Sequence, residues 1–195
     1  MDIAPFPSGI DRDAFGHWLS GFTDGEGSFC LTWARPNPGR NNRSPRASFA
    51  IRVRDDDLPI IQLICSYFGT GHLSRGRASG RGNRKPSAGY VCNGIAGLIA
   101  SVVPHFELYP LRAKKRLDFE IWKEAVLLMG TVISRPRKSL GHSCGQKCRW
   151  SESDRNQFEN LRKRLCEIRK HPSRKTEALE IAFPFKNRKP TPELQ

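Results

Sequence analysis

This chain of 195 residues lacks the sequence features of a membrane-spanning, secreted or lipid-anchored protein. No apolar run approaches the roughly 20 residues that a membrane-spanning helix needs. The first five residues do not resemble a signal peptide, and no lipidation motif is present. These absences predict a soluble, intracellular protein, in a bacterial cytoplasm or an organelle matrix, without a membrane partner.

Acidic residues are scarce relative to basic ones. The chain has 19 Asp and Glu against 33 Lys and Arg, which gives a formal net charge of +14. Such an excess favours a polyanionic partner. A basic protein of the membrane surface is the alternative, but no basic amphipathic anchor helix stands out. We therefore expect a protein that binds nucleic acid.

We also expect no disulfide framework. The chain has six cysteines, and the cysteines of an intracellular protein are mostly reduced thiols. Four ligands for a tetrahedral zinc ion could come from His142, Cys144, Cys148, Cys166 and His171. However, the Cys-x3-Cys spacing is unusual for zinc, and no second short pair follows. We expect free or buried thiols rather than a structural zinc site.

The most distinctive segment that is present covers residues 15–29. Asp11 or Asp13 can cap a helix that begins just before it, because a carboxylate accepts hydrogen bonds from free backbone N–H groups. An apolar side with helical spacing follows, formed by Phe15, Trp18, Leu19 and Phe22. The pattern predicts an amphipathic helix.

Glycine on another side of this helix needs a separate explanation. Gly21 and Gly25 are four residues apart, and glycine in a helix interior costs about 1 kcal/mol relative to alanine. A second helix that approaches very closely would explain both. Gly25 and Gly27 then end the helix, with Asp24 and Glu26 at its exit. A core helix with a glycine-rich cap and two solvated acids is the simpler alternative.

Residues 19–27, Leu-Ser-Gly-Phe-Thr-Asp-Gly-Glu-Gly, resemble the signature helix of the LAGLIDADG homing endonucleases. In that family the helix forms the interface between two αββαββ units, and its final acid binds the catalytic metal. The resemblance assigns that acid to Glu26 and makes the carbonyl of Gly25 a further metal ligand. Ser20 stands at the motif's small second position, a departure that keeps the residue small. The implied dimer interface consists of Leu19, Gly21, Phe22 and Gly25.

The pattern after this helix repeats strand, strand, helix. We expect strands at 28–33, 48–54, 72–77 and 88–92, and helices at 58–68 and 94–103, capped by Asp57 and Asn93. This order matches the αββαββα fold of the family, an α+β architecture whose curved antiparallel sheet faces DNA. The core would span 10–130. A C-terminal helical extension at 131–186, with a capping box at 151–154, and a flexible tail at 187–195 would follow.

Basic residues lie on the strands and on the segments between them. In the second strand Phe49, Ile51 and Val53 share one face, whereas Arg52 and Arg54 share the other. A sheet with one apolar and one basic face suits docking on DNA, although solvated surface arginine is the alternative. The predicted DNA contacts are Arg35, Arg40, Arg43, Arg46, Arg52, Arg54, Arg75, Arg77, Arg81, Arg84 and Lys85.

Residues 109–119 resemble the family's segment after the last core helix, where a lysine lies near the cleaved phosphate. Lys114 or Lys115 fits that place, and we favour Lys114. Some family members also place a polar residue late in the second strand, where it orients the attacking water. The matching position here is Val53, whose side chain cannot form a hydrogen bond. Either Arg52, Arg54 or Asp55 would contribute instead, or ordered solvent would take this role.

The resemblance implies a homodimeric endonuclease that uses Mg²⁺, or Ca²⁺ or Mn²⁺ in its place, to hydrolyse both strands of a long near-palindromic site in double-stranded DNA. One signature helix is present in the 195 residues, so a second chain would supply the other half-site. Two alternatives remain. The first is an RNA maturase that assists splicing of its host intron, and the second is a DNA-binding regulator of the same fold that does not cleave.

Overall fold

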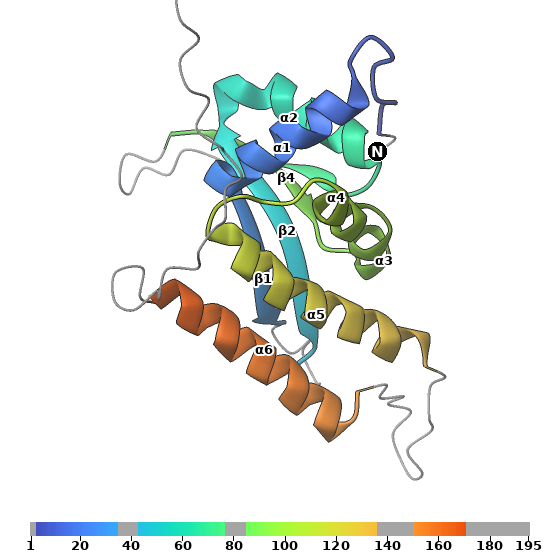
Figure 1. Ribbon diagram of the computed structural model, residues 1–195, viewed down its shortest axis with the longest axis vertical. Coiled ribbons are helices and arrows are strands. Elements are labelled where there is room, and N and C mark those ends of the chain that lie inside the picture. Colours follow the sequence, from blue (N-terminus) through green and yellow to red (C-terminus); the bar gives the residue numbers. More distant parts are fainter. Residues whose placement is uncertain (1–2, 35–42, 77–84, 136–149, 171–195) are drawn as a thin grey trace, which may run out of the picture.

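The computed structural model describes residues 3–34, 43–76, 85–135 and 150–170. Helices and strands follow the predicted αββαββα order, in which α3 and α4 form the last helical segment, and helices α5 and α6 come after it (Figure 1). The elements are α1 (Arg12–Glu26), β1 (Gly27–Trp33), β2 (Pro45–Arg54), α2 (Leu58–Phe68), β3 (His72–Gly76), β4 (Ser87–Cys92), α3 (Ile95–Gly97), α4 (Val103–Leu108), α5 (Lys115–Ser134) and α6 (Glu152–Lys170). The α+β prediction is confirmed.

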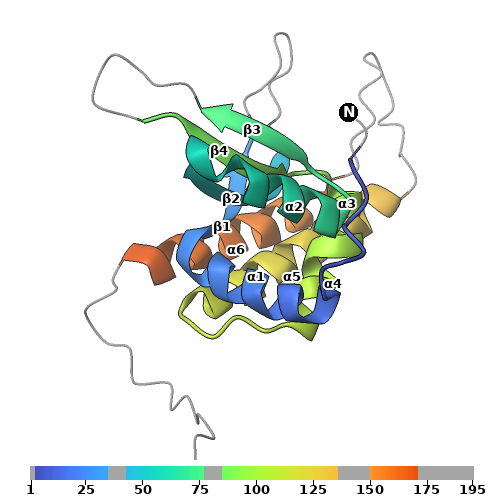
Figure 2. The ribbon, with the colours of Figure 1, turned by 90° about the horizontal axis from the view of Figure 1, so that it is seen from above.

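The four strands form one antiparallel sheet in the order β1-β2-β4-β3. Its ladder pairs Phe29 with Phe49, and Phe49 with Cys92. Because residues directly opposite each other in an antiparallel ladder point to the same face of the sheet, these apolar residues share one face. Helices α1, α2 and α5 lie on this side of the sheet (Figure 2). The opposite face carries Arg52 and is left to solvent.

Aromatic side chains fill the space between sheet and helices. The Phe29 ring lies 5.1 Å from both the Phe49 and Trp122 rings, and Phe49 lies 5.3 Å from Phe106. All four are almost fully buried. Such side chains contribute most of the apolar area that stabilises a core. The sheet and α5 are thereby held as one body.

Helix α6 also belongs to this core, although we expected the C-terminal region to be an extension. Phe158, Leu161 and Leu165 from its apolar side are buried in the same hydrophobic cluster. Its predicted capping box is confirmed: Ser151 Oγ accepts from the Asp154 backbone N–H at 3.1 Å, and Asp154 accepts from the Ser151 N–H at 2.9 Å. Helix α5 ends at Ser134, a few residues beyond the predicted limit of the core at 130.

Helix α2 has the predicted bounds and is followed by the cap residue Gly69, whose φ of 63° lies in the left-handed region that favours glycine. Asp57 stands at the predicted N-cap position, but its side chain forms no capping hydrogen bond, so the capping contact expected from the sequence is not made. Residues 55–57 instead form a short 3₁₀ turn. Since that turn supplies the entry to the helix, the side chain of Asp57 is left exposed.

The helix expected at 94–103 runs on to residue 108 and is split into α3, a π-helical turn at 98–102, and α4. Pro104, in the first turn of α4, explains the break. It has no N–H to donate, and its ring would clash with the carbonyl four residues earlier in a regular α-helix. The predicted Asn93 cap is also wrong, since Gly94 stands at the cap position without a side-chain hydrogen bond.

No helix within the described residues is long and apolar enough to span a bilayer.

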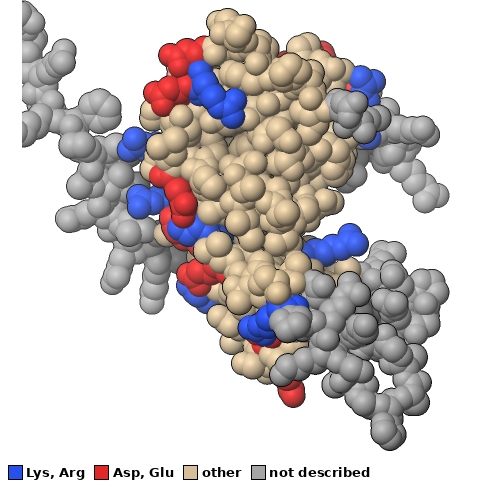
Figure 3. Space-filling view, turned by 90° about the vertical axis from the view of Figure 1, so that its right-hand side faces the viewer, with Lys and Arg blue, Asp and Glu red and all other residues tan. Residues whose placement is uncertain are grey.

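The side of the molecule that carries α3 and α4 is covered mainly by uncharged residues in its upper and central part (Figure 3). The charged side chains visible on this side lie nearer its edges. Surface charge is therefore unevenly distributed.

Candidate active site and nucleic-acid interface

Glu26 is the last residue of α1, and β1 begins at the next residue. Its carboxylate is exposed. A Cβ atom at Gly27 would overlap the side chain and carbonyl of Thr23, so only glycine permits this tight passage from helix to strand. The final carbonyls of a helix lack intrahelical partners and carry its partial negative charge. Glu26 therefore stands where a cation is favoured.

Asp24, in the last turn of α1, holds the segment before α5 in place. Its Oδ2 accepts hydrogen bonds from the backbone N–H groups of Arg112 at 2.8 Å and Ala113 at 3.1 Å. Its Oδ1 is buried and has no hydrogen-bond partner in the described part of the chain. The sequence left this acid without a role. The contact brings the start of α5 to the end of α1.

Lys115 is the first residue of α5, and it points at the end of α1. Its Nζ donates to the carbonyl of Thr23 at 3.0 Å and to that of Gly25 at 3.2 Å. Burial lowers the pKa of Lys115, whereas the charges of Asp24, Asp118 and Glu26 act to raise it and that of Arg169 to lower it. The geometry favours Lys115 over Lys114, the reverse of our sequence-based preference. A one-residue register at a helix start is not encoded in the local pattern.

The end of α1 can hold a hard cation. The Glu26 carboxylate and the Gly25 carbonyl are oxygen donors of the type that Mg²⁺ and Ca²⁺ prefer. The contact between the Lys115 ammonium and the Gly25 carbonyl shows that positive charge is accommodated there. Two such ligands are too few for a complete coordination shell. Water, phosphate or a second copy of Glu26 would have to supply the remainder.

Within the described ranges, no three His, Cys, Asp or Glu side chains gather closely enough to hold a metal. Of the zinc candidates, Cys166 is described as a half-buried free thiol on α6. The other candidates, His142, Cys144, Cys148 and His171, lie outside the described residues. The zinc hypothesis therefore stays untested.

The solvent face of the sheet carries Arg46, Arg52 and Arg54, all exposed. Arg54 forms an ion pair with Asp56 at 2.7 Å. Arg75 differs, because its ladder partner is the buried Ala88 on the helix-covered face. A side chain on that face does not join the arginines of the opposite one, so we leave Arg75 out of the proposed DNA contacts.

Two of the remaining predicted DNA contacts belong to the described residues. Arg43 and Lys85 are exposed, and the Arg43 carbonyl accepts a hydrogen bond from Arg155 at 3.0 Å. The others fall outside the described residues: Arg35, Arg40, Arg77, Arg81 and Arg84. Their contact with DNA stays a prediction.

Val53, the position expected to lack a water-orienting group, packs against the hydrophobic core. It pairs with Ala88 on the helix-covered face. Its side chain therefore points away from the solvent face of the sheet. Arg52 and Arg54, one residue to either side, point toward solvent and are the polar groups available there.

The outer side of α1 combines aromatic residues with glycine. Trp18 is 41% exposed and stacks on Phe22, with ring centroids 4.8 Å apart. A Cβ atom at Gly21 or Gly25 would meet nothing within 4 Å. Leu19 is fully buried in the core of its own chain, so its side chain cannot contact a partner. We therefore no longer include it in the predicted dimer interface.

The inner side of α1 is fixed by a buried polar network that the sequence did not reveal. Ser20 Oγ donates to the Tyr109 carbonyl at 2.6 Å, so it accepts from His105 Nε2 at 3.3 Å. His105 Nδ1 then accepts from the Tyr67 hydroxyl at 3.0 Å. Burial, with the nearby charge of Arg12, lowers the pKa of His105 to about 3. In the sequence, the one sign of this buried network is Ser20, a polar residue among the apolar residues of the helix.

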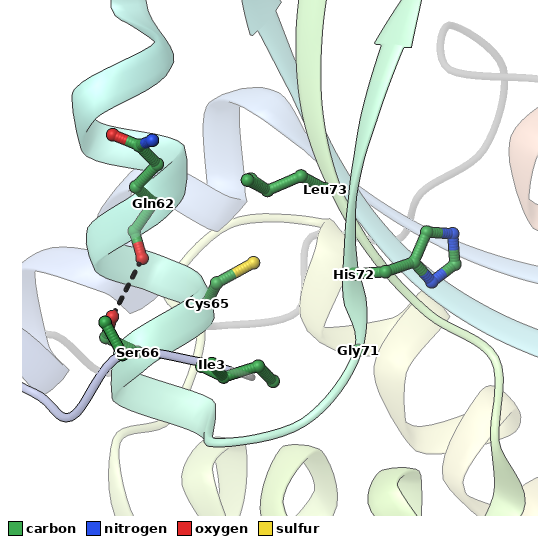
Figure 4. Close-up of a pocket in the computed structure, with 8 residues that line it drawn as sticks. Ile3, Gln62, Cys65, Ser66, Gly71, His72 and Leu73 are labelled. Carbon is green, nitrogen blue, oxygen red and sulfur yellow. Dashed lines mark hydrogen bonds between the residues drawn. The ribbon is translucent and has the colours of Figure 1, made fainter. Parts of the chain in front are cut away.

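A cavity of about 510 Å³ lies between the N-terminal segment, α2 and β3 (Figure 4). Cys65 and Leu73 are among the residues that line it. The His72 ring points away from α2, on the other side of β3 (Figure 4). None of the predicted catalytic residues lines this cavity. The candidate active site is thus at the exposed end of α1 and not in this cavity.

Comparison with known proteins was made by sequence and by structure. The model of the LAGLIDADG endonuclease family matches residues 19–126, more than half of the chain. Probable intron-encoded endonuclease 2 of Neurospora crassa is 30% identical over 149 residues, which cover 74% of this chain and 32% of that protein. Probable intron-encoded DNA endonuclease 1 of Mycosarcoma maydis is 27% identical over 114 residues, which cover 57% and 38%. The chain spans about a third of the length of these relatives.

Two solved structures show the same fold. The meganuclease I-SmaMI bound to uncleaveable DNA is 19% identical, with a TM-score of 0.60 over 76% of this chain and 43% of that chain. The homing endonuclease I-TnaI is 18% identical, with a TM-score of 0.58 over 82% of this chain and 95% of that chain. Together with the family match, this likeness agrees with the resemblance of residues 19–27. The chain belongs to the LAGLIDADG endonuclease family.

Proposed function

We propose that this protein is a site-specific endonuclease that hydrolyses both strands of double-stranded DNA as a homodimer with Mg²⁺. The observation that carries the proposal is the placement of Glu26 and Lys115 together at the end of α1, beside a sheet with arginines on its solvent face. An acid, an ammonium group and a basic surface are the parts needed to bind and cleave a phosphodiester backbone. The names of the relatives, intron-encoded endonucleases, support the same activity.

Each site residue has a separate proposed role. Glu26 and the Gly25 carbonyl would hold the cation, which when bound supplies Lewis-acid polarisation of the phosphate and activation of water. Lys115 would leave the helix carbonyls to stabilise charge that develops on the cleaved phosphate. Arg46, Arg52 and Arg54 would lie along the DNA, where arginine reads guanine edges or contacts phosphates.

The homodimer follows from the outer side of α1. Trp18 and Phe22 present apolar surface next to Gly21 and Gly25, where a second backbone can approach without a side chain in the way. Two copies of α1 crossing there would bring two Glu26 carboxylates to the same part of the DNA. A two-fold dimer would then read a near-palindromic site.

A library of DNA targets separates this function from its alternatives. The wild-type protein should cut a small set of related sequences in Mg²⁺, whereas Glu26→Gln should bind the same sequences in Ca²⁺ within a few-fold and cut none. Binding without cleavage by the wild type would favour the non-cleaving regulator. Selective binding of intron RNA with no DNA preference would favour the maturase. Cleavage by Glu26→Gln at the wild-type rate would remove Glu26 from the mechanism.

A further inference from the structure

The last turn of α6 reaches both elements that carry the candidate catalytic groups. Arg169 lies outside residues 19–126, which the family model matches. Its Nε and Nη2 contact Asp118 Oδ2 at 2.9 Å and 2.8 Å, and its Nη2 donates to the Phe29 carbonyl at 2.6 Å. One guanidinium group therefore bridges α5 and β1.

Both attachment points are close in sequence to the active site. Asp118 follows Lys115 by three residues on α5, and residues at this spacing are neighbours on one side of a helix. Phe29 follows Glu26 by three residues, and β1 is an edge strand of the sheet. The Asp118 side chain is only 13% exposed, and the Arg169 side chain is 39% exposed. A charge-assisted contact with this degree of burial holds its partners in a fixed geometry better than an ordinary surface pair.

The contact of Arg169 with Asp118 and Phe29 matters because Lys115 does not hold α5 in place once its ammonium group has moved to the phosphate. Its ammonium group now binds the Thr23 and Gly25 carbonyls. A phosphate that draws the ammonium away removes those two bonds. Asp24 still anchors the backbone at Arg112 and Ala113, before the helix begins. Besides the apolar packing of Phe119 on Phe29, whose ring centroids lie 5.6 Å apart, Arg169 is the polar contact that links the first turn of α5 to β1.

We propose that Arg169 is a positioning residue, which fixes the first turn of α5 against the start of β1 and so sets the placement of Lys115 relative to Glu26. The inference rests on the proposed function and deepens it. Helix α6 is then part of the catalytic arrangement through this one contact. A misplacement of reacting groups by about 1 Å can reduce a rate by about 100-fold.

The test compares Arg169→Gln with Arg164→Gln in the full chain. Arg164 also joins α6 to α5, through Glu124 at 3.3 Å, but both of its partners are more than half exposed and neither adjoins the site. At saturating DNA in Mg²⁺, Arg169→Gln should slow single-turnover cleavage by about 10- to 100-fold. Its affinity for the site in Ca²⁺ should stay within about three-fold, and Arg169→Lys should recover part of the rate. Arg164→Gln should cleave like the wild type.

A double-mutant cycle identifies the route of the effect. If Arg169 acts through Lys115, adding Arg169→Gln to Lys115→Met should produce little further loss. If Arg169→Gln does not fold, Asp118→Asn removes the same tie from the other side and should show the same pattern.

Three results would overturn the inference alone: wild-type cleavage by Arg169→Gln, an equal loss in Arg164→Gln, or an undiminished further loss in the Lys115→Met background. A wild type that binds DNA and cleaves none would overturn the proposed function and this inference together.

Discussion

Two adjacent lysines in this protein have different environments. Lys114 is exposed, whereas Lys115 is half-buried, and its ammonium group lies against two helix carbonyls. Burial disfavours the charged form, and the three acids nearby favour it. Lys115 is thus a cation held beside Glu26 by the fold. At the scale of single residues, placement and not residue type distinguishes the two.

Replacing each lysine in turn tests that distinction. Lys115→Met should slow cleavage by about 100-fold or more, the effect typical of removing one group that stabilises developing charge. Lys114→Met should have a far smaller effect. Single-turnover cleavage at saturating DNA measures both, and affinity in Ca²⁺ serves as the control. If the losses are reversed, the register predicted from the sequence is right and the assignment to Lys115 is wrong.

His105 makes protein stability depend on pH. The ordinary pKa of histidine is about 6.5, and burial lowers that of His105 to about 3 in the folded protein. The unfolded chain therefore binds a proton that the folded one does not, and stability is lost as pH falls below 6.5. Between pH 7 and 5 the loss from this residue should reach about 2 kcal/mol.

Chemical denaturation at several pH values measures this effect. His105→Gln should be less stable than the wild type at pH 7 but should show a flatter dependence down to pH 5. His17→Gln, at an exposed position on α1, is the matched control. An unchanged pH dependence in His105→Gln would show that other groups cause the acid sensitivity.

At the scale of elements, residues within one helix or strand were predictable, and long-range contacts were not. Alternating apolar residues placed β2, and the capping pair at Ser151 and Asp154 placed the start of α6. Both signals are local. The network around His105 joins residues far apart in the sequence, and no local pattern specifies it. The same holds for Arg169, which meets Phe29 across most of the chain.

The sequence could not distinguish the glycine of α1 that the fold requires from one that only a partner could require. A Cβ atom at Gly16 would collide with the Tyr109 ring, whereas one at Gly21 would meet only open space. Gly16 is therefore required by the fold of a single chain. Gly21 is not, and alanine there would even favour the helix by about 1 kcal/mol. A requirement for Gly21 would have to come from a partner.

Substitution at these two positions tests the proposed dimer. Gly21→Leu should leave the unfolding temperature of the single chain close to the wild-type value, yet it should abolish dimers on DNA and double-strand cleavage together. Gly16→Ala should instead lower the unfolding temperature. Sedimentation with target DNA reports assembly, and a plasmid assay reports cutting. Gly21→Leu protein that still dimerises and cuts both strands would refute the crossing of two α1 helices at this position.

At the scale of the whole molecule, the net charge of +14 favours a polyanionic partner, and the arginines of the sheet indicate the surface where we propose that it binds. Arg46 and Arg52 are exposed on the solvent face, whereas Arg75 is exposed on the helix-covered side of the same sheet. All three arginines contribute equally to the net charge. They differ only in the face of the sheet to which their side chains point. That face follows from the alternation of side chains along a strand and from the register of the ladder.

The salt dependence of DNA binding tests which face meets DNA. Each phosphate contact that is lost should reduce the slope of log K against log salt by about 0.9. The double variant Arg46→Gln/Arg52→Gln should therefore flatten the slope by up to twice that amount, or relax the sequence preference if these side chains read bases. Arg75→Gln removes the same kind of charge from the other face and should leave both unchanged. Titrations of one cognate and one unrelated duplex between low and physiological salt measure slope and preference together. Equal effects of Arg75→Gln and Arg52→Gln would mean that net charge alone governs binding, and the solvent face of the sheet would lose its assignment as the DNA-binding surface.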